Sequence, residues 1–428
     1  MAQSEWGLLG PESLPSQRRT RTLGLGATVR SFNELAVPGL GNIFFAKQMI
    51  LALLGIRVAE KLREAGQVAR NIETANAVEA LACYLALSSN NWQRDPRVRG
   101  ATKMRGKDDL SFAAVKRRSF YVTQPMRMAT GEPLISLGLV DASTGRFNSF
   151  VCGSSSLELF SSFCEASGPT YRQNNVLEHL VGWAKGHIPN VSNLGNALSP
   201  LKPLPQETRQ ALRGMLMAGN EASSARRRTM LAWVTRLAKT RPPQTEWTAK
   251  PPELEETHWQ DLHAGALFFA VREAALVLLD HLEAHVRTQQ SQHVCLGNEL
   301  DTLLSPLLET LGERADGFLQ HSHDPSPDGQ AGAFCRECLD KTRAIEHLVR
   351  RDDRVLRLRD EKVIPGPAFP RTAEAATDSD ATLVEDEDEF STTQSSGLPE
   401  GISHRAKNLY LLHLDLEGSL DNWFGGES

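Results

Sequence analysis

Apolar positions recur every three to four residues along most of the chain, which is the spacing of the buried face of an α-helix. The period is strongest from His258 to about Gln289, where a wide apolar stripe requires partner helices, for which 299–319 and 335–349 are the candidates. The same period covers residues 43–65, 74–88, 175–187, 206–219 and 221–240. We therefore expect a mainly α protein, with a small β-hairpin in the stretch RVLRLRDEKVIPGPAF at 354–369.

Breaks in this pattern divide the chain. The stretch RPPQTEWTAKPPELEE at 241–256 has no period, so we expect a Pro-rich linker between a helical unit at 32–240 and a helical domain at 257–371. Residues 1–31 are expected to form a flexible basic arm. Eight acidic residues and no basic one between 372 and 390 predict a disordered acidic linker over 372–400. The final stretch, 401–428, is expected to dock back as a C-terminal segment.

Two short helices followed by a β-hairpin are expected in the stretch SFYVTQPMRMATGEPLISLGLVDASTGRFNSFVCG and the residues just before it. A short helix is expected over 110–118, and Thr123 is a suitable N-cap for a second helix that ends at Gly138. Alternating apolar and polar residues then predict two strands, at 139–141 and 147–151, joined by the turn ASTGR. Pro133 lies inside the second helix and is expected to split it, leaving 123–130 as its regular part.

Helix, turn, helix and hairpin in this order resemble the winged helix-turn-helix of bacterial regulators, over residues 109–166 only. The resemblance implies that the second helix reads duplex DNA. Thr123, Gln124 and Arg127 are then the candidate base contacts, because Gln pairs with adenine, Arg with guanine, and Thr with a thymine methyl group or a phosphate. The alternative use of a winged unit is protein docking, in which Met126 and Met128 line an apolar contact.

The charge distribution supports the DNA interpretation. The net charge of the chain is −5, yet ten basic residues face only three acidic ones between Arg94 and Arg127. Basic side chains neutralise phosphates. The candidate phosphate contacts are Arg97, Arg99, Lys103, Arg105, Lys107, Lys116, Arg117, Arg118 and Arg146. The alternative is that the Lys-Arg-Arg run at 116–118 is a solvated helix end.

Composition sets the broad class of protein. Hydrophobic residues make up 40% and charged residues 23% of the chain, which is ordinary for a globular protein. Six cysteines without framework spacing, and a start that lacks a secretion signal, predict a cytoplasmic protein. The apolar stretch at 36–56 contains Pro38, Asn42 and Lys47, so we expect a buried helix there and no membrane partner.

Chemical motifs are few. His321, His323, Cys335 and Cys338 could supply four ligands to a zinc ion, but packing roles are commoner for such residues, so we expect no metal and no cofactor. No phosphate-binding glycine loop and no paired catalytic carboxylates rise above chance, so we expect no enzymatic activity. Two functions remain. The first is a bacterial duplex-DNA-binding regulator or DNA-recognition component. The second is a scaffold subunit of an antiviral-defence or mobile-element complex that binds other protein subunits.

Overall fold

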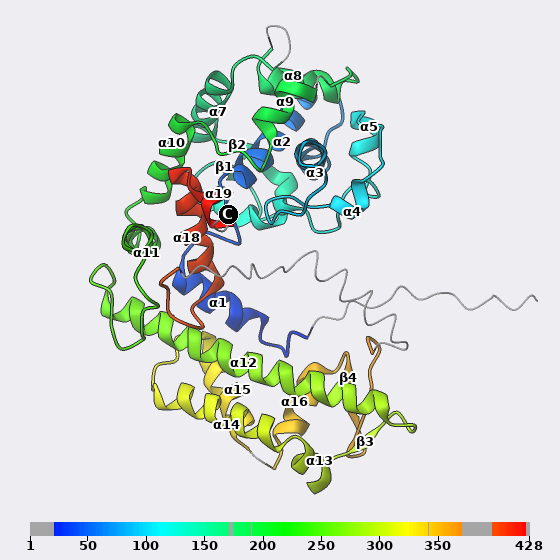
Figure 1. The fold of residues 1–428 in the computed structure, drawn as a ribbon, viewed down its shortest axis with the longest axis vertical. Helices are drawn as coiled ribbons and strands as arrows, with labels where there is room; N and C mark the ends of the chain where they lie inside the picture. Colours follow the sequence, from blue (N-terminus) through cyan, green and yellow to red (C-terminus); the bar gives the residue numbers. More distant parts are fainter. Residues whose placement is uncertain (1–20, 171–173, 190, 341, 370–395, 425–428) are drawn as a thin grey trace, which may run out of the picture. The chain divides into compact units, whose positions relative to one another are not determined.

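The computed structural model describes residues 21–170, 174–189, 191–340, 342–369 and 396–424. This part of the chain is mainly helical, as predicted, and it forms two compact units (Figure 1). We call the described residues of 29–266, 323–326 and 385–428 the large unit, and those of 1–28, 267–322 and 327–384 the small unit. The expected arm at 1–31 and the expected acidic linker at 372–400 lie largely outside the described residues, although helix α1 already begins at Gly26.

The large unit contains most of the helices. In chain order its elements are α1 (Gly26–Ala36, from residue 29), α2 (Lys47–Glu64), α3 (Asn71–Ser89), α4 (Ala101–Met104), α5 (Phe112–Val115), η1 (Met126–Ala129), α6 (Gly131–Ser136), β1 (Val140–Ala142), η2 (Phe147–Ser149), β2 (Phe150–Cys152), α7 (Ser154–Ser167), α8 (Val176–Ala184), α9 (Val191–Leu198), α10 (Gln206–Met217), α11 (Ala222–Thr240), the start of α12 (Glu256–Thr288), α18 (His404–Glu417) and α19 (Leu420–Phe424).

Helices α2 and α3 are the centre of the large unit. Every residue from Lys47 to Ile56 on α2 is buried, and the two helices pack closely because α2 carries a glycine at the contact. A Cβ atom on Gly55 would lie 2.2 Å from the Cα atom of Ala75 on α3. The helices predicted at 43–65 and 74–88 are therefore confirmed. The expected N-cap, Thr74, instead lies inside α3, where its hydroxyl donates to the Arg70 carbonyl at 3.0 Å.

The C-terminal helix α18 also belongs to the large unit. It contacts α10 and α11, and its sequence begins after Ser403, whose hydroxyl caps the helix and donates to Asn33 on α1 at 2.7 Å. The carboxylate of Asp415 accepts the Ala46 backbone N–H at 2.8 Å. Chain segments far apart in sequence are thus joined in one core.

The division between the two units differs from the one we expected at 241–256. Leu254 is buried in the large unit, and Trp247 stacks on His263 with ring centroids 4.7 Å apart. The backbone N–H of Thr245 also donates to the Gly397 carbonyl. These contacts fix the Pro-rich stretch within the large unit, and the division falls at residues 266 and 267, inside α12. The prolines prevent a regular helix there, while Pro251 and Leu254 are buried and anchor the stretch.

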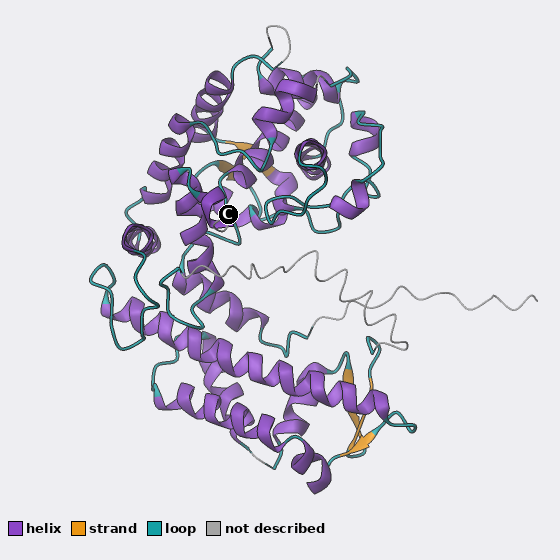
Figure 2. Cartoon of the chain, viewed as in Figure 1, coloured by secondary structure: helices purple, strands orange, loops and turns teal. Residues whose placement is uncertain are grey.

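The small unit consists of the rest of α12 and the elements β3 (Val294–Cys295), α13 (Asn298–Leu303), α14 (Ser305–Gln320), η3 (Pro327–Gly329), α15 (Gln330–Leu339), α16 (Ala344–Asp352), β4 (Leu356–Arg359) and β5 (Lys362–Pro365). The predicted hairpin is confirmed as β4 and β5, and β3 extends it to a three-stranded antiparallel sheet (Figure 2). Phe268 on α12 packs near Phe318 and Phe334, so α14 and α15 supply partners for its apolar stripe.

By length and composition, α12 passes the test for a helix that could cross a membrane. The core helix of a soluble protein passes the same test, and 56% of the relevant window is buried inside the structure. The cysteines are mostly enclosed as well. Cys295 is exposed, Cys152 is half-buried, and the remaining four are buried.

The winged helix-turn-helix is not confirmed. The first helix, expected over 110–118, is the four-residue α5, and the second, expected over 123–130, is the 3₁₀-helix η1 followed by the six-residue α6. Pro133 has no N–H to donate to the Ala129 carbonyl, which explains the break between η1 and α6. The hairpin is present as β1 and β2, with Asp141 opposite Val151.

Candidate nucleic-acid interface

Six basic side chains between α3 and η1 are exposed to solvent. They are Arg94, Lys103, Arg105, Lys116, Arg117 and Arg118, and we call this set the basic surface. Within the described part of the chain, none of the six forms an ion pair with a carboxylate. Exposed cations that form no ion pair keep their positive potential available to an anionic ligand.

Internal contacts hold the stretches of the basic surface beside one another. The Lys107 ammonium group donates to the carbonyls of Ser119 and Phe120 at 3.0 and 2.9 Å and lies 4.8 Å from the Phe120 ring centre. The Arg105 guanidinium group lies 5.8 Å from the Trp92 ring centre. The stretches around residues 92–94, 103–107 and 116–120 therefore form one continuous surface.

Three of the nine expected phosphate contacts point inward instead. Arg97 is buried and bound to Asp95 and, at 2.5 Å, to Asp421 on α19. Arg99 donates to the Gln124 carbonyl at 2.5 Å, and Lys107 is engaged as described above. These cations hold the segment together, and sequence position alone does not distinguish them from their exposed neighbours.

The expected base contacts do not share one helix face. Thr123 is exposed and Gln124 is half-buried. The Arg127 guanidinium group donates to Asn76 on α3 at 2.5 Å and lies 5.1 Å from the Phe147 ring centre. Burial lowers the pKa of Arg127, in keeping with its position away from solvent. In this arrangement Arg127 binds the protein itself.

Glu79 is the residue that organises this segment, and our sequence analysis missed it. Its carboxylate is buried on α3 and accepts hydrogen bonds from the Tyr121 hydroxyl (2.9 Å), the Met126 N–H (2.6 Å) and the Arg127 N–H (2.8 Å). Burial raises its pKa. The signal in the sequence is a single carboxylate inside the apolar run ANAVEALACYLAL, because a buried acid requires donors from elsewhere.

The hairpin that carries Arg146 is fixed to the two central helices. The Asn71 side chain on α3 donates to the carbonyls of Phe147 and Phe150, and Glu60 on α2 accepts the Cys152 N–H at 2.7 Å. Arg146 is exposed at the turn between the two strands. It is thus held in place through the hairpin backbone and remains available to a ligand.

The candidate zinc ligands do not form a cluster. Across the described residues, no group of three or more His, Cys, Asp or Glu side chains could hold a metal ion. His323 binds Asp261 at 2.7 Å in the large unit, whereas Cys335 and Cys338 are buried on α15 in the small unit. Burial raises the pKa of Cys338, which disfavours the thiolate that zinc requires.

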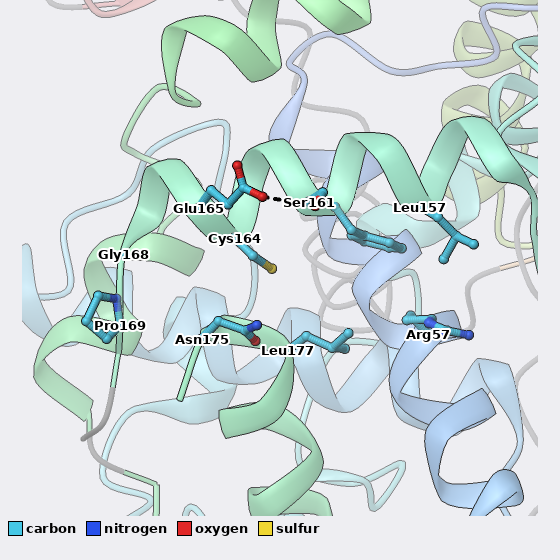
Figure 3. A pocket seen from close by; sticks show the side chains of 10 residues that line it. Arg57, Leu157, Ser161, Cys164, Glu165, Gly168, Pro169, Asn175 and Leu177 are labelled. Atoms are coloured by element: carbon cyan, nitrogen blue, oxygen red, sulfur yellow. Dashed lines mark hydrogen bonds between the residues drawn. The ribbon is translucent and has the colours of Figure 1, made fainter. Parts of the chain in front are cut away.

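A pocket of about 490 Å³ opens between α7 and α8 (Figure 3). Its polar side chains are already paired with protein groups. Arg57 binds Glu60 at 2.7 Å, and the Ser161 hydroxyl donates to Glu165 at 3.2 Å. Burial raises the pKa of Cys164, so its thiol is a poor nucleophile.

We compared the chain with protein-family models, with curated proteins and with solved structures, and none of them matches it.

Proposed function

We propose that this chain binds duplex DNA through the basic surface, by contacts to the phosphate backbone. The observation that carries the proposal is the set of six exposed cations, none of which forms an ion pair with a carboxylate of the described residues, in a chain whose net charge is −5. Phosphate neutralisation with counterion release supplies most of the affinity in binding of this kind, and it needs no fixed recognition helix.

Binding of this kind has little preference for sequence. Reading bases through Thr123, Gln124 and Arg127 requires side chains that face a DNA groove, and Arg127 is engaged by Asn76 and the Phe147 ring. A more specific version of the proposal is that residues 109–166 bind DNA as a winged helix. The β1–β2 hairpin with Arg146 supports it, and the short α5, η1 and α6 weigh against it.

The salt dependence of binding tests the proposal. Replacing Lys103, Arg117 and Arg118 by Ala should weaken binding to every duplex sequence. It should also reduce the slope of log affinity against log salt by about 0.9 for each phosphate that the protein no longer neutralises, up to about 2.7. The control replaces three exposed lysines elsewhere in the large unit, Lys202, Lys239 and Lys407, which removes equal charge. An equal slope in the two triple variants would exclude the basic surface as the interface.

Protein docking is the second candidate function, because apolar side chains are exposed next to the same segment. Met128 on η1 is 59% exposed and Ile135 on α6 is 42% exposed. A scaffold subunit would use them to bind another protein of its system. Met128→Asp combined with Ile135→Asp should then release a copurifying subunit while leaving DNA affinity unchanged, and loss of DNA affinity in this variant would argue against separate surfaces.

A further inference from the structure

A cleft of about 300 Å³ in the large unit continues from the basic surface. It is lined by the loop that precedes α3, the first turn of α3, α5 and the end of α8, and α5 contacts both α3 and α8. Lys116 belongs to the basic surface and also lines the cleft. The cleft and the basic surface therefore form one continuous site, and a role for the cleft rests on the proposed function.

Positive charge predominates in the cleft. Its cations are Arg70, Lys116 and Lys185, and its carboxylate is Glu73. Glu73 lies 3.7 Å from Arg70, and both side chains of this loose pair are about half exposed or more. In the described residues, Lys116 and Lys185 have no ion-pair partner. Lys116 and Lys185 can therefore bind an anionic group even when Arg70 is paired with Glu73.

One wall of the cleft carries an aromatic ring, Phe112, and the Lys116 ammonium group lies 5.5 Å from the centre of that ring. The Phe112 ring lies edge-on to Trp183, with centroids 5.1 Å apart, and the Trp183 indole N–H donates to the Leu110 carbonyl at 2.8 Å. Trp183 is completely buried, so Phe112 rests on a fixed support. At the rim, the Val68 side chain is fully exposed. An aromatic ring and an aliphatic rim are surfaces on which a nucleic-acid base can stack.

We propose that this cleft binds one unpaired nucleotide, with Lys116 and Lys185 on its phosphate and Phe112 and Val68 against its base. The volume is at the lower end of the roughly 300–1,000 Å³ of small-molecule sites, which suits one nucleotide and is far too small for a duplex. A strand that leaves a duplex on the basic surface reaches the cleft at Lys116. The protein then prefers DNA with an unpaired end over blunt DNA.

The experiment compares three probes on the full chain. They are a blunt duplex, the same duplex with a four-nucleotide overhang that carries a 5′-phosphate and 2-aminopurine, and deoxyadenosine monophosphate alone. The overhang should increase affinity roughly 5- to 150-fold and change the 2-aminopurine fluorescence, as stacking of one base on an aromatic ring predicts. Competition by the monophosphate would identify free nucleotides as ligands. Its absence, with the overhang preference intact, would identify strand ends.

Substitutions in the cleft test whether the preference for the overhang arises there. Lys185→Ala and Phe112→Leu should abolish the preference for the overhang and leave blunt-duplex affinity unchanged. Glu73→Gln should enlarge the preference, because it removes the carboxylate that repels a phosphate. Lys407→Ala, which removes one exposed charge on α18, is the control and should change nothing.

The two proposals fail in different ways. Salt-sensitive binding of the blunt duplex with no gain from the overhang would overturn the cleft and keep the proposed function. Binding of the overhang strand alone, with no affinity for the blunt duplex, would overturn the proposed function and keep the cleft.

Discussion

At the scale of single residues, the segment that carries the basic surface depends on one buried carboxylate. Glu79 satisfies three donors at once, and its hydrogen bonds with Tyr121 and Met126 are buried. A donor left unsatisfied in a buried position costs about 1–3 kcal/mol. The position of residues 121–127 is therefore set from α3 and not by their own helix propensity.

Glu79→Ala should lower the free energy of unfolding of the large unit by about 2–4 kcal/mol, because it removes the acceptor of the Met126 and Arg127 backbone N–H groups and leaves the Tyr121 hydroxyl only the Cys83 sulfur atom at 3.3 Å. Chemical denaturation followed by tryptophan fluorescence measures it. Glu73→Ala, at an exposed acid on the same helix, is the control and should stay within about 0.5 kcal/mol of the wild type. A cost below about 1 kcal/mol at Glu79 would contradict the organising role.

A buried histidine gives the large unit a specific pH dependence. His258 donates to the Ala36 carbonyl, and burial lowers its pKa to about 4. The ordinary value is about 6.5. Between these two values the unfolded chain binds a proton at this position and the folded chain does not. Stability from this residue is therefore present above about pH 6.5 and is lost as pH falls toward 4, by about 1.4 kcal/mol per pH unit.

His258→Gln should remove this contribution, so the stability gap between wild type and variant should narrow as pH falls from 6.5 to 4. Denaturation curves at four pH values measure the gap. Gln67→Ala, an exposed substitution in the same unit that removes no titratable group, should leave the gap independent of pH. A gap that is constant for His258→Gln would show that the residue is not buried in its neutral form.

At the scale of elements, the long helices follow from local pattern and the short ones do not. Helices α2, α3, α10 and α11 each present an apolar period over three or more turns, and all four were predicted. The segment at 110–136 contains the same types of residue, but its apolar period lasts for only about one helical turn at a time. Its conformation is set by Pro133 and by Glu79, which lies 47 residues before Met126 and 48 before Arg127. No local pattern reveals such a contact.

The candidate site was also predictable from the sequence only in part. The excess of basic residues between Arg94 and Arg127 is visible in the sequence. Which of these residues point outward depends on partners such as Asp421 and Asn76, which are distant in sequence. The division at residues 266 and 267 differs from the expected one for a similar reason, because the half-buried Trp247 packs against Trp259 and His263 of the helix that follows it.

The close packing of α2 on α3 predicts a sharp effect at one glycine. Gly55→Ala should destabilise the large unit by about 3 kcal/mol or more, because the new Cβ atom meets the Ala75 backbone and the helices must separate. Thermal unfolding measures it. Gly214→Ala on α10 is the matched control, since nothing lies within 4 Å of its Cβ position. It should stabilise the helix by about 0.5–1 kcal/mol, and equal effects at the two positions would contradict the packing described.

At the scale of the whole molecule, the two units have separate internal networks. In the small unit Arg21 binds Asp280, Glu283 at 2.7 Å and Asp352 at 3.2 Å, and the last two carboxylates are buried. The described tryptophans all lie in the large unit and are Trp92, Trp183, Trp233, Trp247, Trp259 and Trp423. Tryptophan fluorescence therefore reports the large unit, whereas far-UV circular dichroism reports the helices of both.

Arg21→Ala should destabilise the small unit by about 3 kcal/mol, because it removes the cation that binds the buried Asp352 carboxylate, while Glu283 keeps the Arg287 guanidinium group at 2.5 Å. In a Trp6→Phe background, which removes the tryptophan outside the described residues, the dichroism transition should move to lower denaturant while the fluorescence transition stays in place. Lys362→Ala, at an exposed position of β5, is the control. A shift of equal size in both signals would show that the chain unfolds as one cooperative body.

The uneven exposure of the cysteines makes the molecule suitable for spectroscopic distance measurement. Cys295 is exposed in the small unit, whereas burial raises the pKa of the half-buried Cys152 to about 12 and suppresses its reactive thiolate. A maleimide dye at neutral pH should therefore attach to one sulfur atom without any engineered site. Energy transfer from the tryptophans of the large unit to that dye would then follow the separation of the two units, with and without DNA, in the native sequence.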